Sequence, residues 1–311
     1  MNDATGNAGN NSAGFIVRPF VFGASPDTGI PTTISAATIG GLSSGSVVSG
    51  FGGVALVNTA LVAVDLSVGS NNTNQSFSGV ISGAGSMTKI GAGTQTLAGV
   101  NTYTGVTTVS NGTLEAAGAS ALGGTTNITV NTGGTLLLSN TGTTDRINNA
   151  ATMTLAGGIV AISGNVTEGS SRGIGALTLS ASSVIDFANG DGTLKWDDSH
   201  AVSWTGLLSI YNYTPGADHL FFGIVDHDFN GTDGGLMTAQ LSQVSFFSGI
   251  NTGFLGSTSF LSGGAGEIAP VPEPSSVAIV LGLLGLVGWR EGRKTRRPQR
   301  ISVPAEHEPV A

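Results

Sequence analysis

Short apolar runs separated by Gly, Asn and Ser dominate the chain from about Thr32 to Phe187. The runs are rich in Thr, Val, Ile and Leu, which is typical of β-strands, and each is too short for a helix. No helical periodicity is visible before the C-terminal tail. The predicted strands are Gln75–Ile81, Thr94–Leu97, Thr107–Val109, Thr113–Ala116, Ile128–Val130, Thr135–Leu138, Met153–Leu155, Ile159–Ile162, Leu177–Leu179 and Val184–Phe187, and Leu61–Val68 alternates over part of its length. The pattern therefore predicts an all-β body.

Short strands with frequent turns are compatible with a sandwich, a barrel or a solenoid. We favour the solenoid because these strands are short for a sandwich, and because Asn and Gly recur quasi-periodically, as at the corners of successive coils. The predicted fold over residues 32–189 is a parallel β-helix whose coils stack about 4.8 Å apart and hydrogen-bond to one another. Val, Leu and Ile are expected to point inward, and Thr, Ser and Asn outward.

Composition favours packed β structure over disorder. Only 10% of the 311 residues are charged and 40% are hydrophobic, whereas disorder goes with low hydrophobicity and high charge. The 50 glycines follow no strict three-residue period, which excludes collagen. Residues 1–289 carry five basic and 16 acidic residues, so a nucleic-acid partner is not expected. Because there is no Cys, the fold needs neither disulfides nor a thiolate metal site.

One stretch of the chain carries a repeat. The segment Gly85–Leu97 continues into Asn101–Gly105 and then into Thr107–Leu114. Its Gly-x-Gly-Thr, Asn-Thr-Tyr-Thr-Gly and Gly-Thr-Leu positions resemble the autotransporter-associated β-strand repeat, which we place around residues 79–118. The resemblance implies a right-handed β-helix of the kind found in autotransporter passengers. Gly tolerates left-handed corner angles, Asn can form ladders between coils, and Tyr103 is expected to shield a turn.

The C-terminal region 267–297 carries three features in a defined order. A Val-Pro-Glu-Pro motif precedes an apolar run, Val277 to Trp289, and a basic cluster follows at once. The motif is Val271, Pro272, Glu273 and Pro274, and the basic cluster is Arg290, Arg293, Lys294, Arg296 and Arg297. The apolar run is shorter than the roughly 20 residues of a permanent membrane helix, and the basic residues act as a cytoplasmic stop. The region resembles the PEP-CTERM sorting signal, with residues 298–311 left as a polar tail.

The PEP-CTERM resemblance implies both a partner and a route. The partner is an exosortase-type transpeptidase. The protein is expected to be exported, to be held transiently in the inner membrane by one short C-terminal hydrophobic helix, and to be cut near the motif before it reaches the cell surface or the extracellular space. An ordinary single-pass anchor is the alternative. Residues 1–31 form a polar segment without a basic n-region, so we expect either a true start upstream of Met1 or unconventional export.

The texture of the chain changes near Gly190, where aromatic residues become frequent and beyond which all three Trp lie. We predict an antiparallel β cap over residues 190–266, with a short helix at Thr238–Gln243. Segments such as Trp204–Ile210 and Gly235–Phe246 resemble the C-terminal block of repeat-bearing PEP-CTERM proteins. An open solenoid end exposes a row of unpaired backbone groups, and an aromatic-rich cap would cover it.

The best metal candidate is the alternating set Asp226, Asp228, Asn230 and Asp233. Carboxylate and amide oxygens suit Ca²⁺, and Gly231 stands at the sixth position as in calcium loops. Met237 stands where such a loop needs a carboxylate, and a polar hairpin tip is the alternative interpretation. Calcium is therefore the one cofactor that the sequence raises.

No catalytic residues are predicted. The few charged residues between Ile30 and Ser180 are scattered, whereas glycoside hydrolysis generally needs paired carboxylates. Asp145 and Arg146 are expected to form an exposed ion pair of little energetic weight, and Asp197–His200 a polar turn.

These patterns predict a non-enzymatic, exported surface or extracellular-matrix protein, with contact to biofilm exopolysaccharide as one hypothesis. An adhesin or glycan-binding passenger is the runner-up, because outward hydroxyls and amides can hydrogen-bond sugars but equally serve to solvate a surface. A β-helical polysaccharide-active enzyme ranks third.

Overall fold

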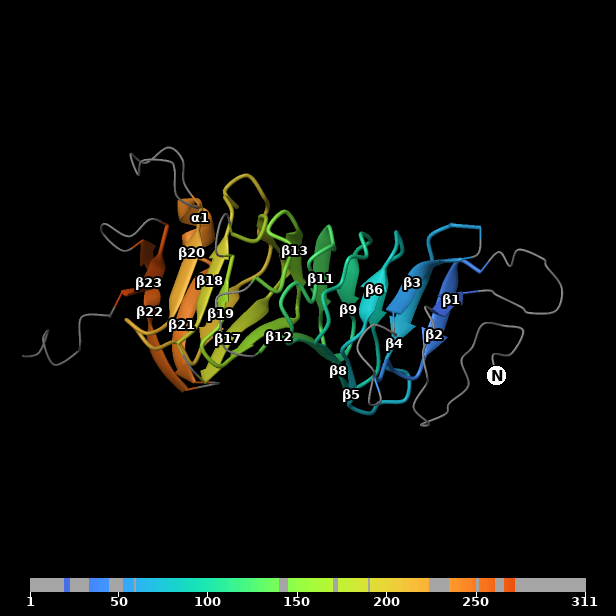
Figure 1. Ribbon diagram of the computed structural model, residues 1–311. Coiled ribbons are helices and arrows are strands. Elements are labelled where there is room, and N and C mark those ends of the chain that lie inside the picture. The colour runs from blue at the N-terminus through green and yellow to red at the C-terminus, as the bar shows by residue number, and fades with distance from the viewer. Residues whose placement is uncertain are drawn as a thin grey trace, which may run out of the picture. The chain divides into compact units, whose positions relative to one another are not determined.

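The chain winds repeatedly about one axis and builds three sides of a β-solenoid. The computed structural model describes residues 20–22, 34–44, 53–58, 60–139, 145–169, 173–189, 191–223, 235–249, 252–260 and 266–271. Two long sheets form two of the sides, and two three-stranded sheets lie on the third (Figure 1). The predicted all-β solenoid is therefore confirmed.

The first long sheet has seven strands, and every pair of neighbours in it is parallel. Its strands, in spatial order, are β2 (Ala36–Ile39), β4 (Asp65–Val68), β7 (Met87–Lys89), β9 (Thr107–Val109), β11 (Asn127–Asn131), β13 (Thr152–Ala156) and β16 (Leu177–Ala181). Successive coils are roughly 20 to 25 residues apart in sequence, as in other solenoids.

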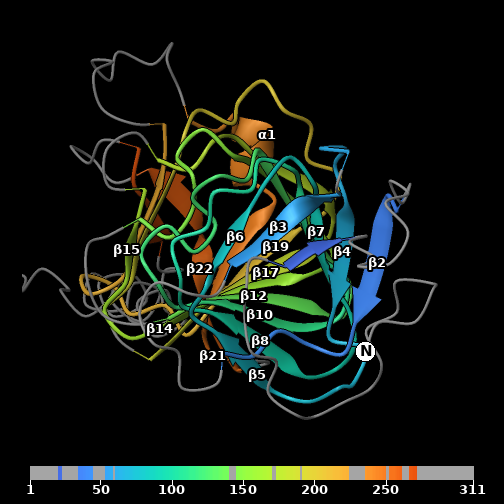
Figure 2. The same cartoon turned by 45° about the vertical axis from the view of Figure 1, so that its right-hand side comes forward.

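The second long sheet has ten strands. In spatial order they are β5 (Gln75–Phe77), β8 (Thr94–Leu97), β10 (Gly112–Ala116), β12 (Gly134–Leu138), β14 (Ile159–Ser163), β17 (Ser183–Asn189), β19 (Leu208–Tyr211), β21 (Val244–Gly249), β22 (Thr252–Phe260) and β23 (Ile268–Val271). In Figure 2 its strands β5, β8, β10, β12, β17 and β19 follow one another upwards through the centre of the view, and β4 and β7 of the first sheet lie to their right.

The third side is less regular. It carries a sheet of β1 (Phe20–Phe22), β3 (Gly53–Asn58) and β6 (Val80–Ser82), and a second sheet of β15 (Thr167–Glu168), β18 (Thr193–Trp196) and β20 (His219–Phe222). Between them this side has one isolated β-bridge among the described residues, Leu122 to Ile147. Backbone hydrogen bonds, such as those from the Thr102 amide to the Ile81 carbonyl and from the Ser120 amide to the Asp145 carbonyl, also join the coils here. The helix α1 (Thr238–Leu241) precedes β21, which agrees with the short helix expected in that segment.

Glycine forms a column at the corner that follows the strands of the first sheet. Gly69, Gly91 and Gly112 have φ angles of 106°, 69° and 64°. A Cβ on Gly91 would lie 2.0 Å from the carbonyl oxygen of Gly69, and one on Gly112 would lie 2.4 Å from that of Gly91. Both the left-handed backbone and the close stacking of coils therefore require glycine here.

Most predicted strands agree with the structure, with two differences. The run Gln75–Ile81 divides into β5 and β6, which lie in different sheets because the chain turns a corner between them. The alternating run that begins at Leu61 becomes a strand only at Asp65. Leu61 is 81% exposed and has a φ of 61°, so it belongs to a turn.

The antiparallel end of the solenoid is narrower than the predicted cap over residues 190–266. Parallel coils continue through β18, β19 and β21. Among the described strands, β21–β22 and β22–β23 pair antiparallel, and one isolated antiparallel bridge joins Phe221 to Glu267. Some of the aromatic residues of this region, including Trp196, Tyr213, Phe222 and Phe246, fill the inside of the last coils. Trp196 stacks on Phe222 with ring centroids 5.4 Å apart, and Tyr213 contacts Phe246 at 4.7 Å.

Candidate functional site

A row of hydroxyl groups runs along the outer face of the seven-stranded sheet. This hydroxyl row consists of Thr38, Ser67, Thr88, Thr108, Thr129, Thr154 and Thr178, each paired in register with the next. All seven side chains are partly or fully exposed. Because neighbouring strands lie about 4.8 Å apart, the hydroxyls repeat at that spacing.

The register of the row is held from inside the solenoid. Leu66, Met87 and Val109 alternate with row members and are at most 1% exposed. A slip by one residue would move these apolar side chains to solvent and the hydroxyls into the core. Hydroxyls both donate and accept hydrogen bonds, so the row can bind water or the hydroxyl groups of a sugar polymer. The predicted outward placement of Thr and Ser is correct for the hydroxyl row, whereas Thr107 on β9 of the same sheet faces inward and is fully buried.

The repeat segment contains a fully buried lysine that the sequence interpretation missed. Lys89 shares the inward phase of Met87 on β7 and is 0% exposed. Its Nζ donates hydrogen bonds to the carbonyl oxygens of Ile90, Gly91 and Asn111 at 2.6, 2.8 and 3.1 Å. Desolvation lowers the pKa of Lys89, while these carbonyls replace the water that the ammonium loses. The side chain ties together the corners of two neighbouring coils.

Asparagine side chains join the coils, but through the backbone rather than through an Asn ladder. Asn101 accepts a hydrogen bond from the Ile81 amide at 2.8 Å and donates one to the Ala121 carbonyl at 2.6 Å, so it bridges three coils. Tyr103, expected to shield a turn, is fully buried, and its hydroxyl is 2.6 Å from the Thr107 Oγ1. The polar residues of the repeat therefore stabilise the interior of the solenoid.

The expectation that Asp145 and Arg146 form an exposed ion pair is wrong, because Arg146 is only 3% exposed. Its guanidinium Nη1 lies 3.7 Å from the Glu168 Oε2. The Glu168 carboxylate also accepts hydrogen bonds from the backbone amides of Arg146 and Ile147, at 2.8 to 3.0 Å. A buried charge needs a partner. For Arg146, which lies between β12 and β13, that partner is the Glu168 carboxylate of the next coil.

The Glu168 carboxyl predicts a pH dependence of stability. Burial raises its pKa from an ordinary value of 4.5 to about 7, partly offset by the backbone amides. The folded chain then holds this proton more tightly than the unfolded chain does. The stabilisation is complete below about pH 4.5 and is lost as the pH rises through 7. We expect the melting temperature of the native protein, relative to that of Glu168→Gln, to fall between pH 4.5 and 7.5.

The control for this measurement is Glu115→Gln. Glu115 lies partly exposed on β10, where its carboxylate accepts hydrogen bonds from the hydroxyls of Thr96 and Ser139, both at 2.6 Å. If the melting temperature of Glu168→Gln kept the pH dependence and that of Glu115→Gln lost it, the effect would belong to Glu115, and the prediction for Glu168 would be wrong.

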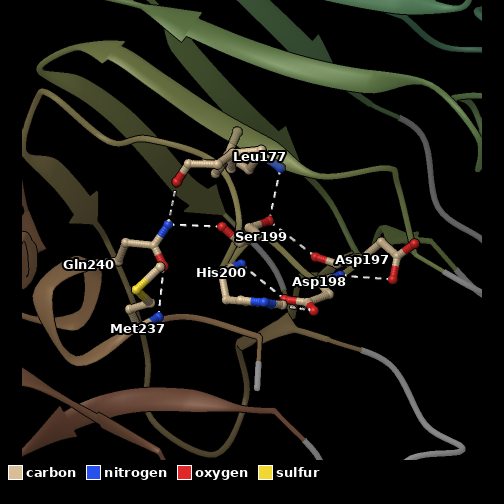
Figure 3. Close-up of polar contacts among 8 residues, drawn as sticks. Leu177, Asp197, Asp198, Ser199, His200, Met237 and Gln240 are labelled. Carbon is tan, nitrogen blue, oxygen red and sulfur yellow. Dashed lines mark hydrogen bonds and ion pairs between the residues drawn. The ribbon is translucent and has the colours of Figure 1, made fainter. Parts of the chain in front are cut away.

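The turn Asp197–His200 combines the residue types of a hydrolase, but its serine is engaged elsewhere (Figure 3). Ser199 is buried, and its hydroxyl accepts a hydrogen bond from the Leu177 amide at 2.9 Å and donates one to the Asp197 carbonyl at 3.1 Å. His200 Nδ1 lies 2.5 Å from Asp198 Oδ2 at the surface. The hydroxyl therefore holds the turn on β16, and the polar-turn interpretation agrees with this geometry.

Gln240 of α1 anchors the same turn from the other side (Figure 3). Its side-chain amide donates hydrogen bonds to the carbonyls of Ser199 and Val202 at 2.8 and 2.9 Å, and its Oε1 accepts one from the Met237 amide at 2.7 Å. These contacts explain why the chain forms a short helix here, and they give the turn a structural role.

Two predicted sites lie outside the described residues. These are the calcium candidate, Asp226 to Asp233, and all of the sorting signal after Val271; Val271 itself, the first residue of the motif, ends β23. Within the described ranges, no group of three or more His, Asp or Glu side chains is arranged to hold a metal ion. The described part of the chain also contains no helix that is both long and apolar enough to cross a membrane.

Comparison with known proteins supports the repeat. The family model of the passenger-associated-transport-repeat matches residues 87–116, which run from β7 to β10. The predicted autotransporter-associated repeat is thereby confirmed. No curated protein and no solved structure matches the chain. The repeat and the parallel stack of coils together define a passenger-like β-solenoid protein.

Proposed function

We propose that the protein is an exported, non-enzymatic component of the cell surface or extracellular matrix. The observation that carries this proposal is the passenger-type repeat set within an unbroken parallel stack of coils. Coils that hydrogen-bond only to their neighbours form long, regular surfaces suited to extended partners. The hydroxyl row offers such a surface, and exopolysaccharide is the partner that its chemistry favours.

The buried charges support a non-enzymatic role. Lys89, Arg146 and Glu168 are three of the few charged residues in the coils, and each is enclosed and hydrogen-bonded within the interior. The Ser199 hydroxyl is bonded to backbone groups on both sides. These side chains stabilise the fold, so a polysaccharide-active enzyme would need other residues.

Export is tested by labelling intact cells. The turn Thr214–Gly216 is exposed, and a side chain at Gly216 would meet no atom within 4 Å. An epitope inserted there is expected to be accessible to antibody on intact cells of the native host. Labelling that requires cell lysis would contradict the surface role.

We further propose that an exosortase-type transpeptidase processes the C-terminal signal. Glu273 is the ionisable group of the Val-Pro-Glu-Pro motif, so Glu273→Ala is expected to leave a full-length, membrane-retained species. Glu306→Ala, which removes the same group outside the motif, is the matched control. Mass spectrometry of the mature surface form is expected to find no peptide beyond Trp289, and normal maturation of Glu273→Ala would overturn the proposal.

An adhesin or glycan-binding passenger is the second candidate. The regular hydroxyl row favours it, because sugar hydroxyls are complementary to a column of groups that both donate and accept. Binding without turnover on a glycan array distinguishes this candidate from an enzyme.

A further inference from the structure

Three aromatic side chains lie together on the outer face of the ten-stranded sheet, close to its C-terminal end. Tyr211 on β19, Phe247 on β21 and Phe254 on β22 form this aromatic row. The ring centroids of Tyr211 and Phe247 are 5.2 Å apart, and those of Phe247 and Phe254 are 5.6 Å apart. Phe254 is 51% exposed, and the other two rings are partly exposed.

The core does not require these rings. Ile210 and Phe246, which alternate with row members, are 0% exposed and face the interior. The same outward column carries Ser76, Thr96, Glu115, Leu137, Ala161 and Asp186 in earlier coils. Aromatic side chains replace these smaller residues only in the last strands. Contiguous exposed aromatic surface marks interaction sites in soluble proteins.

Polar groups border the row on two sides. Asp186, one strand before Tyr211 in the same column, accepts a hydrogen bond from the Asn212 side-chain amide at 2.6 Å. Ser209 precedes Tyr211 by two residues on β19, and Ser245 precedes Phe247 by two residues on β21. The two serines pair in register and are partly exposed. A second column of hydroxyls therefore runs beside the aromatic row, about 7 Å away along the strands.

We propose that the aromatic row, with Asp186, Asn212, Ser209 and Ser245, binds a neutral polysaccharide. The C–H faces of sugar rings can pack on the aromatic faces. The neighbouring carboxylate can accept hydrogen bonds from sugar hydroxyls, the amide NH₂ can donate to them, and the serine hydroxyls can do both. The described residues that form the site include no Lys or Arg and one carboxylate, which disfavours acidic polymers. Three adjacent strands span about 10 Å, enough for a short stretch of polymer. This inference rests on the proposed surface role and names its ligand class.

Two other occupants fit less well. The apolar run Val277–Trp289 would cover the rings with apolar side chains and would bring Asp186 and the two serine hydroxyls out of water without supplying matching polar groups, which is costly. A second copy of this chain, meeting the same face across a two-fold axis, would bring a second Asp186 carboxylate to the interface, where like charges repel. The polar border therefore favours a hydroxyl-rich ligand.

The test is affinity electrophoresis of the purified full chain in gels containing laminarin, dextran or galactomannan, with alginate as the acidic comparison. We expect at least one neutral polymer to retard the native protein and alginate not to. The triple variant Tyr211→Ser, Phe247→Ser, Phe254→Ser should weaken that binding at least tenfold. Phe221→Ser, which removes a partly exposed ring from the three-stranded sheet of β15, β18 and β20, should change it less than twofold.

Two single variants keep the test decisive if the triple variant is poorly folded. Phe254→Ser removes the most exposed ring and should weaken binding, whereas Phe254→Tyr keeps a ring and should bind like the native protein. Melting temperatures of both are expected to match that of the native chain.

Several outcomes would overturn the inference. These are no retardation by any neutral polymer, unchanged binding by a folded triple variant, a dimer in light scattering that the triple variant abolishes without any glycan binding, or capture of a peptide of residues 272–311 by the row. Surface labelling of cells that express the triple variant separates this inference from the proposed export. If the triple variant is labelled on intact cells but does not bind the polysaccharide, the proposed export still holds. If the native chain is not labelled on intact cells, the proposed export is wrong, and the binding inference is unaffected.

Discussion

Replacing Trp196 by Ala is expected to lower the free energy of unfolding of the C-terminal coils by about 3–5 kcal/mol. Trp196 is fully buried on β18 and stacks on Phe222, with ring planes 14° apart. Removing the indole leaves a cavity between coils and also removes a ring contact that stabilises Phe222. Urea titration followed by circular dichroism measures the loss.

Phenylalanine substitutions separate packing from hydrogen bonding. Among the described residues, no acceptor lies within reach of the Trp196 Nε1, whereas the Trp204 Nε1 donates to the Leu177 carbonyl at 2.8 Å. Trp196→Phe keeps a ring and loses no hydrogen bond, so it should cost less than half as much as Trp196→Ala. Trp204→Phe loses a hydrogen bond and should cost about 1 kcal/mol more than Trp196→Phe. Equal losses in Trp196→Phe and Trp196→Ala would show that packing does not dominate.

Replacing Lys89 by Met is expected to destabilise the coils around the repeat by about 2–4 kcal/mol. Met has a similar length and fills the same space, but it leaves three buried carbonyls without the ammonium that they accept from. An unsatisfied buried acceptor costs about 1–3 kcal/mol, and desolvation of the native ammonium offsets part of the sum. Hydrogen exchange of the amides in residues 87–116 locates the loss.

Lys195→Met is the matched control for Lys89→Met. Lys195 is partly exposed on β18, and its Nζ lies 5.3 Å from the Phe221 ring centroid. A cation–π contact at such a site contributes about 0.5–1 kcal/mol, so this substitution should have a small effect. A Lys89→Met variant as stable as Lys195→Met would show that the buried ammonium is dispensable.

The buried charges show where sequence interpretation failed. Lys89 and Glu168 occupy inward positions of strands, and the alternation of β7 does place Lys89 in phase with Met87. Sequence alone cannot say whether a charged residue at such a position is enclosed, because this depends on acceptors from other coils. One of the three acceptors of the Lys89 ammonium is the carbonyl of Asn111, 22 residues away in the sequence. Arg146 was assigned to the surface for the same reason.

The end of the solenoid shows a second limit. Aromatic enrichment after residue 190 marked a change in the chain, and the antiparallel pairing of β21, β22 and β23 does close that end. The boundary was placed too early, because the same aromatic residues serve parallel coils and a hairpin equally well. Whether Phe246 faces inward and Phe247 outward follows from the register of β21 on β19, which involves strands more than 30 residues apart.

The sequence by itself determines the strands, the turns and the parallel winding of this protein. Runs too short for helices, with β-branched residues and Gly or Asn at the corners, specify strands and turns, and the repeat at residues 87–116 specifies the parallel coil. Only the tertiary structure decided which polar side chains are enclosed, which hydroxyls line up from Thr38 to Thr178, and that three rings meet on the outer face. The physical reason is register, because stacking coils in a solenoid joins residues that are distant in sequence, and only the pairing of whole strands sets which of them meet.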